Sequence, residues 1–313
     1  MILMAAMGVL LLVGLTLTIW WGGTRYEPWD PRDVGGRPGP PTPVARPRPR
    51  DTTLRYLRGV AIALVGGFWA GALVTGPSMR LVMRLLAATA STSAQGKITE
   101  AKEVIGNIDL DGTIGLYLFG GIFPGLLSGG IYLALRRWLP SGRLGGVAFG
   151  ALHLVIAATR IDPLRPDNPD FDLVGPGWLS VATFGLATVL HGMAVVAIAN
   201  RYSTRFPPGP ASLGKRARAV VPLALPGLML LPGVFLVIPI LAGLVATVGL
   251  SQVGPVVRAA RGRATLVIGR LAVGAVAVAL LPGTVLDLRE VVIREGPIPV
   301  QKRVVDAGDA RTG

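Results

Sequence analysis

The sequence contains no cysteine, only two histidines and few charged residues. The absence of cysteine excludes disulfides, thiol nucleophiles, iron–sulfur clusters and cysteine-based zinc sites. Charged residues make up 15% of the 313 residues and hydrophobic residues 51%, whereas soluble domains are about 25% charged. A soluble chain of this composition would lack the polar surface that it needs. The sequence therefore predicts a membrane protein whose charges lie in its loops.

Basic residues outnumber acidic ones, 31 to 17, which gives a formal net charge of +14. Nucleic acid is not an expected partner, because the chain has little polar surface and its basic clusters carry no aromatic platform on which bases would stack. Clusters of Lys and Arg beside membrane spans are typical of contacts with anionic lipid headgroups. The residues expected to make such contacts are Lys215, Arg216, Arg218, Arg258, Arg261 and Arg263.

Several apolar runs are close to the 20 residues that a helix needs to cross a bilayer. The predicted fold is therefore an all-α, polytopic transmembrane bundle. Trp20 and Trp21 are expected interface anchors of the first span, and Pro282-Gly283 is expected to end the last one. The predicted organisation is a first span at 1–21, a Pro/Arg-rich cytoplasmic linker at 22–58, a bundle at 59–282 with an extracytoplasmic loop at 80–112, and a polar tail at 283–313.

The apolar stretch 219–250 is interrupted by prolines at 222, 226, 232 and 239. A single straight helix of this length would be about 48 Å long, which exceeds the membrane. The prolines favour a hairpin that turns near Pro232-Gly233, with a short or re-entrant first arm. A hairpin gives eight crossings in total, and a single crossing of 219–250 gives seven.

The distribution of charge favours eight crossings. With the N-terminus outside, the inner segments hold 20 basic and 4 acidic residues, and the outer segments hold 11 basic and 13 acidic residues. Positive charge is expected on the cytoplasmic side, and the seven-crossing alternative separates the charges less well. We therefore expect a bacterial plasma-membrane protein with both termini extracytoplasmic.

His153 and His191 are the ionisable groups expected deepest in the membrane. Each lies ten residues from a basic inner boundary, Arg143 and Arg201, or about 15 Å along a helix. Their spans are consecutive and antiparallel, so the rings are candidates for cofactor binding. The alternatives are axial ligation of one haem, a quinone or proton relay, a weak metal site, and interhelical hydrogen bonds with no cofactor. We expect the last of these, and no metal or catalytic residue.

Glycines four residues apart predict close helix packing, because they let two backbones approach. They occur in two spans, as Gly121, Gly125 and Gly129 and as Gly146 and Gly150.

The sequence carries no catalytic constellation and no Asp or Glu within its spans. Coupled transporters usually need such an acid. The leading hypothesis is therefore a non-enzymatic membrane protein with a structural, assembly or accessory role, with a membrane protein or a second copy as partner. The alternatives are a permease or lipid-path protein that uses the broken segment 219–250, and a histidine-pair redox protein.

Three short blocks form a recurrent pattern: Gly76-Pro77-Ser78-Met79-Arg80-Leu81, Ile98-Thr99-Glu100-Ala101, and Asp111-Gly112-Thr113-Ile114-Gly115 followed by Phe119-Gly120-Gly121. The pattern resembles uncharacterised multi-spanning membrane proteins of GC-rich bacteria. The resemblance covers about 50 residues and implies no activity.

Overall fold

The computed structural model describes residues 2–28, 48–206, 221–232, 236–254 and 262–294. Within these ranges the chain is helical and has no strand; one isolated bridge joins Ile98 and Val104. The prediction of an all-α bundle is confirmed. Five helical segments are long and apolar enough to cross a membrane, and two shorter apolar helices accompany them. The predicted count of eight crossings is not confirmed.

Two of the long segments and one of the shorter apolar ones consist of helices joined without a break. A π-helical turn, η1 (Gly71–Thr75), joins α2 (Pro49–Ala70) to α3 (Gly76–Thr89), and η3 (Leu118–Ile122) joins α4 (Leu110–Tyr117) to α5 (Phe123–Leu135). A third, η4 (Leu154–Ala158), extends α6 (Arg143–His153). The remaining helices are α1 (Ile2–Trp21), α7 (Gly177–Arg205), α9 (Ala224–Leu228), α10 (Val237–Ser251) and α12 (Arg263–Val292).

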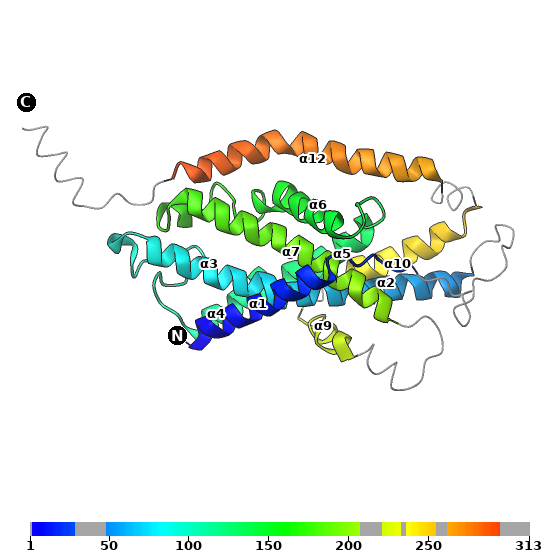
Figure 1. Cartoon of the computed structure of the whole chain (residues 1–313), viewed down its shortest axis with the longest axis horizontal. Coiled ribbons are helices and arrows are strands. Elements are labelled where there is room, and N and C mark those ends of the chain that lie inside the picture. The colour runs from blue at the N-terminus through cyan, green and yellow to red at the C-terminus, as the bar shows by residue number, and fades with distance from the viewer. Residues whose placement is uncertain (1, 29–47, 207–220, 233–235, 255–261, 295–313) are drawn as a thin grey trace, which may run out of the picture.

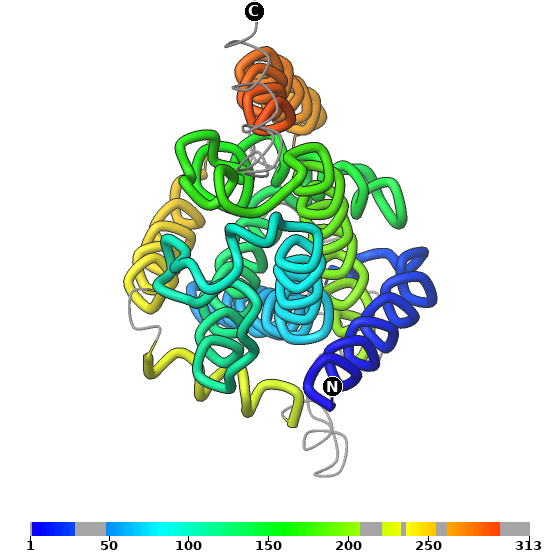
Figure 2. The backbone as a smooth tube through the Cα atoms, turned by 90° about the vertical axis from the view of Figure 1, so that its left-hand side faces the viewer, coloured from blue at the N-terminus to red at the C-terminus, as the bar shows by residue number. Residues whose placement is uncertain are grey.

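The helices lie roughly along one axis, with α7 packed against α1, α2, α6 and α12 (Figures 1 and 2). Side chains of α2, α6 and α7 form the largest buried apolar cluster, around Ile62, Phe149 and Val195. Helices α1, α10 and α12 lie at the margins, and the most apolar window of α12 has no buried residue. A helix that is apolar all round and unburied needs lipid as its surroundings.

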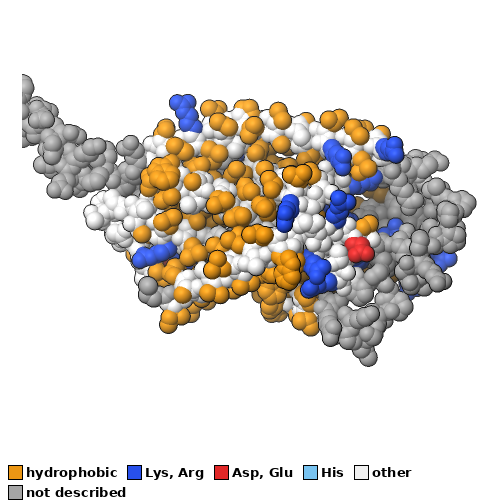
Figure 3. Space-filling view, viewed as in Figure 1, with side chains coloured by type: hydrophobic (Ala, Val, Ile, Leu, Met, Phe, Trp, Pro, Cys, Tyr) orange, Lys and Arg blue, Asp and Glu red, His pale blue; other side chains and the backbone are white. Residues whose placement is uncertain are grey.

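The loops and helix ends gather at two opposite ends of the bundle (Figure 1). We call the end with Glu27, Arg58 and Arg136 the linker end, and the end with the segments 90–109 and 159–176 the loop end. At the linker end, Arg58 donates to the carbonyls of Glu27 and Ser203, and the Arg136 guanidinium lies 3.8 Å from the Tyr26 ring centroid. Along the face in Figure 3, hydrophobic side chains dominate the length between the ends, and most of the visible Lys and Arg lie toward the linker end.

At the loop end, the segment 90–109, the segment 159–176 and the end of α12 pack together. Arg165 pairs with Glu100 at 2.7 Å, and Arg294 donates to the Asn168 carbonyl at 3.1 Å. Phe171 and Val291 are buried in an apolar cluster that continues into α3 and α7. These loops therefore form a packed cap at the loop end.

The structure differs from two expected boundaries, both near a proline. The sequence placed an extracytoplasmic loop at 80–112, whereas the helix continues past Pro77 as α3 to Thr89. The π-helical turn before Pro77 widens the helix, so the proline ring is accommodated without a break.

The last span was expected to end at Pro282, and the tail to begin at 283, but α12 continues to Val292. One missing hydrogen bond costs less than exposing the several backbone groups that a helix end would leave unpaired in an apolar medium. Thr284, two residues further on, is 2% exposed and contacts the Val155 carbonyl at 3.1 Å, so packing against η4 also holds this turn.

Candidate functional site

The two histidines lie side by side in the centre of the bundle. His153 ends α6 and His191 lies in the middle of α7. Their ring centroids are 5.8 Å apart with an interplanar angle of 76°. His191 is buried, and His153 is half-buried.

A serine from a third helix joins the two rings. Ser128 Oγ of α5 lies 2.5 Å from His153 Nε2 and 2.9 Å from His191 Nε2. His191 Nδ1 lies 2.5 Å from Thr75 Oγ1, at the end of η1, and His153 Nδ1 lies 2.9 Å from the Phe149 carbonyl. The network therefore links the α2–α3 segment, α5, α6 and α7.

The chemistry of the partners orients every hydrogen bond in this network. A carbonyl only accepts, so His153 Nδ1 carries a proton, and in the neutral ring Nε2 accepts from the Ser128 hydroxyl. Ser128 Oγ then accepts from His191 Nε2, and His191 Nδ1 accepts from the Thr75 hydroxyl. With both rings neutral, each of their nitrogens has a partner. Polar groups in apolar surroundings need hydrogen-bond partners, and these interhelical bonds supply them.

The geometry does not fit a haem between the two rings. Bis-histidine ligation requires the iron and porphyrin plane to separate the two Nε2 atoms. Here both Nε2 atoms are within hydrogen-bond distance of the same Ser128 hydroxyl. Neither of the two cavities described in the structure is lined by a histidine.

Glycines bring these helices close enough for the network to form. A Cβ at Gly192 of α7 would collide with Gly150 of α6, one turn before His153. A Cβ at Gly146 would lie 3.1 Å from Met193 Cα. In the same way, a Cβ at Gly121 of η3 would meet backbone atoms of Gly76, and a Cβ at Gly125 or Gly129 of α5 would meet backbone atoms of Gly67 or Ala63. All five glycines of the two predicted packing faces thus lie at helix contacts.

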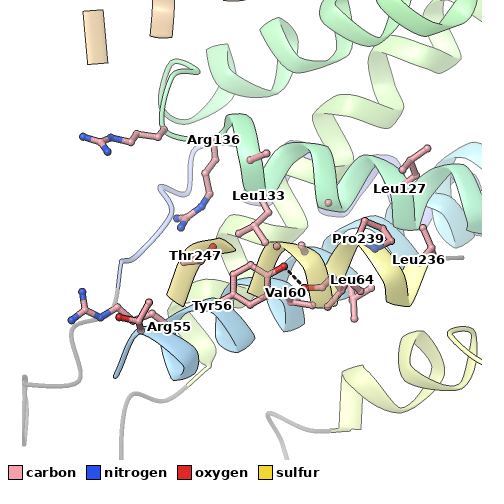
Figure 4. Close-up of a pocket in the computed structure, with 18 of the residues that line it drawn as sticks. Arg55, Tyr56, Val60, Leu64, Leu127, Leu133, Arg136, Leu236, Pro239 and Thr247 are labelled. Atoms are coloured by element: carbon pink, nitrogen blue, oxygen red, sulfur yellow. Dashed lines mark hydrogen bonds between the residues drawn. The ribbon is translucent and has the colours of Figure 1, made fainter. Parts of the chain in front are cut away.

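A large cavity lies beside this core, between α2, α5 and α10, with a volume of about 890 Å³ (Figure 4). Its apolar walls include Leu64, Leu127 and Leu236, and its other end carries Arg55 and Arg136. Arg137 and the hydroxyls of Thr52, Thr247 and Ser251 also line it. The cavity therefore has an apolar interior and a cationic rim at the linker end.

Helix α10 closes one side of the cavity and is fastened to α2. The Tyr56 hydroxyl donates to the Ile240 carbonyl at 2.7 Å, and a Cβ at Gly243 would collide with the same hydroxyl. Since α10 comes from the proline-rich stretch 219–250, that stretch lines a cavity.

Sequence reasoning did not select the arginines of the rim. The sequence shows Arg136-Arg137 at the end of a span and Arg55 one turn before Arg58. It does not show that these arginines border the same cavity. Of the residues expected to contact headgroups, Arg263 begins α12 and is exposed. The others, Lys215, Arg216, Arg218, Arg258 and Arg261, lie outside the described residues.

Comparisons of the chain with protein-family models, with curated proteins and with solved structures give no match.

Proposed function

We propose that this protein is a lipid-binding membrane protein whose cavity between α2, α5 and α10 receives an anionic amphiphile. The observation that carries the proposal is the shape and polarity of that cavity. Its volume of about 890 Å³ is in the range that binds drug-sized or larger ligands. Apolar walls suit acyl chains, and guanidinium groups suit a phosphate or carboxylate in bidentate geometry.

The position of the cavity supports a lipid rather than a water-soluble ligand. Its cationic rim lies at the linker end, where the flanking chain segments are strongly basic. Positive charge marks the cytoplasmic side of a membrane protein, and that leaflet carries the anionic lipids. We place the linker end in the cytoplasm of a bacterial cell and the loop end outside. The predicted basic clusters at 215–218 and 258–263 would then contact headgroups of the same leaflet.

This arrangement implies an even number of crossings. Helices α1, α6, α7 and α12 and the two composite segments each run from one end toward the other (Figure 1). We propose that the segment from α9 to α10 enters and leaves at the linker end, as a re-entrant hairpin that walls the cavity.

Binding is a better interpretation than catalysis. Of the described residues that line the cavity, none is His, Asp or Glu, and the hydroxyl of Tyr56 is already bonded to the Ile240 carbonyl. A lipid-binding protein combines the accessory role expected from the sequence with the lipid-path alternative, because α10, part of the broken segment, lines the cavity.

Lipid titration of the purified protein tests the proposal. The variant Arg55→Gln/Arg137→Gln removes two guanidinium groups from the rim, each worth about 1 kcal/mol to an anionic headgroup, so affinity for phosphatidylglycerol should fall about 30-fold. Arg48→Gln/Arg50→Gln makes the same charge change at two exposed positions on and beside α2 and should change affinity much less. If both variants lost the same affinity for phosphatidylglycerol, the rim arginines would not form a specific headgroup site.

A second variant tests the apolar part of the cavity. Gly130 lines it, and a Cβ there meets no atom within 4 Å. Gly130→Phe should fold normally, narrow the cavity and weaken binding of the long-chain lipid. Unchanged binding by a folded Gly130→Phe protein would place the lipid elsewhere.

A further inference from the structure

We propose that His153 and His191 bind one monovalent copper ion through their Nε2 atoms. This inference is independent of the lipid cavity. Both Nε2 atoms lie within hydrogen-bond distance of the Ser128 hydroxyl, at 2.5 and 2.9 Å. A copper ion bound between the two nitrogens would displace that hydroxyl to the position of a weak third ligand, a shift smaller than the separation that a porphyrin plane would require.

The opposite ring nitrogens already have the partners that a ligating histidine needs. Metal-binding histidines use the second nitrogen to donate to a carbonyl or another oxygen, which fixes the ring and its tautomer. His153 Nδ1 donates to the Phe149 carbonyl at 2.9 Å, and His191 Nδ1 lies 2.5 Å from the Thr75 hydroxyl. A hydrogen bond at Nδ1 therefore fixes the orientation of both rings.

A tautomer change at His191 makes both Nε2 lone pairs available together. Without metal, His191 Nε2 donates to Ser128 and Thr75 donates to His191 Nδ1. The Thr75 hydroxyl also lies 3.5 Å from the Ala70 carbonyl. When it turns to that carbonyl, its oxygen accepts from His191 Nδ1, and the proton moves from Nε2 to Nδ1 of the same ring. The site takes up the cation without releasing a proton.

The surroundings select a monovalent ion with a low coordination number. The described part of the chain contains no group of three or more His, Asp, Glu or Cys side chains around a point, so the higher coordination of Zn²⁺ or Fe²⁺ is not supplied. No carboxylate lies in the network to neutralise a second charge, and burying uncompensated charge is costly. Imidazole is a good ligand for copper.

Competition with a chromophoric Cu(I) chelator, under anaerobic reducing conditions, tests the site in the full-length protein in detergent. Wild type should remove one equivalent of copper from bicinchoninate, with no background from thiols because the chain has no cysteine. His191→Phe should lose this equivalent, and Ser128→Ala should keep it, since the hydroxyl is not a main ligand. Equal copper binding by wild type and a folded His191→Phe protein would overturn the proposal.

X-ray absorption at the copper edge of the loaded wild-type protein keeps the test decisive if the histidine variants fail to fold. Two nitrogen scatterers at the distance of imidazole coordination would support the site. A first shell of sulfur would assign the copper to methionines and overturn the proposal, as would failure of the wild type to compete for any copper.

Discussion

A single hydroxyl replaces the amide that Pro77 lacks. In the π-helical turn η1, the Gly76 amide donates to the Gly71 carbonyl, five residues back. The next amide in this pattern would be that of Pro77, which has no N–H, so the Ala72 carbonyl would be left without a partner. The Tyr117 hydroxyl donates to that carbonyl. An unpaired carbonyl in apolar surroundings would otherwise destabilise the segment.

Tyr117→Phe is therefore expected to lower the free energy of unfolding by about 1–3 kcal/mol. In a Pro77→Ala background, the amide N–H gained at position 77 can reach the Ala72 carbonyl, and the same Tyr117 substitution should cost much less. Thermal unfolding of the four proteins in detergent measures the difference. Equal costs in the two backgrounds would show that the hydroxyl does not act in place of the proline amide.

Asp170 in the packed cap at the loop end gives a pH-dependent contribution to stability. Partial burial raises the pKa of its carboxyl, and Glu100 acts in the same direction; the Glu100 amide and Arg165 oppose the shift. Because the pKa is higher in the folded protein, the folded state binds this proton more tightly, and stability falls as pH rises from the unfolded pKa through the folded one.

Asp170→Asn should accordingly stabilise the protein slightly at pH 7, by less than about 1 kcal/mol because the group is partly exposed. The gain should disappear at a pH below the unfolded pKa of about 3.9. Melting temperatures at several pH values measure the effect. Asp167→Asn is the control, since that carboxylate is 70% exposed. A gain at acidic pH as large as the one at pH 7 would rule out titration as its cause.

At the level of helices, α2 and α5 are in direct backbone contact. A Cβ at Gly67 would collide with the Gly125 carbonyl, and one at Gly129 with the Ala63 carbonyl. A Cβ at Gly71 would lie 2.5 Å from the Gly121 oxygen. This contact places Ser128 beside the two histidines, so helix packing and the buried network depend on each other.

Gly67→Ala should separate α2 from α5 and cost about 1–3 kcal/mol, as overpacking of a tight interface does. Gly130→Ala lies on the same α5 helix with no atom within 4 Å of its Cβ; it should be neutral or stabilise by up to about 1 kcal/mol through helix propensity. Unfolding in detergent compares the two variants. Similar effects of both would argue against a backbone contact at Gly67.

The whole molecule has two chemically different ends. The inner segments expected from the sequence hold 20 of the 31 basic residues, and the loop end is a packed cap with paired charges. Positive charge is retained on the cytoplasmic side during insertion, so we expect one orientation in the membrane.

Single cysteines test that orientation without background, because the chain has none. Ser93→Cys and Ala101→Cys, exposed at the loop end, should react with a membrane-impermeant maleimide in intact cells. Ser141→Cys and Thr204→Cys, exposed at the linker end, should react only after lysis. Labelling of the second pair in intact cells would reverse the proposed orientation.

Much of the architecture was predictable because it depends on local composition. Apolar run lengths indicated a first span at 1–21 and a helical bundle within 59–282, and the prolines of 219–250 indicated a broken segment. The same local reasoning failed at Pro77 and Pro282, where a π-helical turn and tertiary packing let the helix continue. Proline predicts a missing hydrogen bond, and its neighbours in space decide whether the helix ends.

The sequence by itself determined the class of protein, the all-helical fold and the places where close packing was available, because hydropathy, helix length and glycine spacing are properties of the chain. Only the tertiary structure decided that Ser128 lies between the two histidines, that Tyr117 caps the Ala72 carbonyl and that Arg55 and Arg137 border one cavity. These contacts depend on how each helix is rotated and displaced against neighbours that are distant in sequence. Apolar periodicity is a weak guide to rotation when lipid and protein interior are equally apolar.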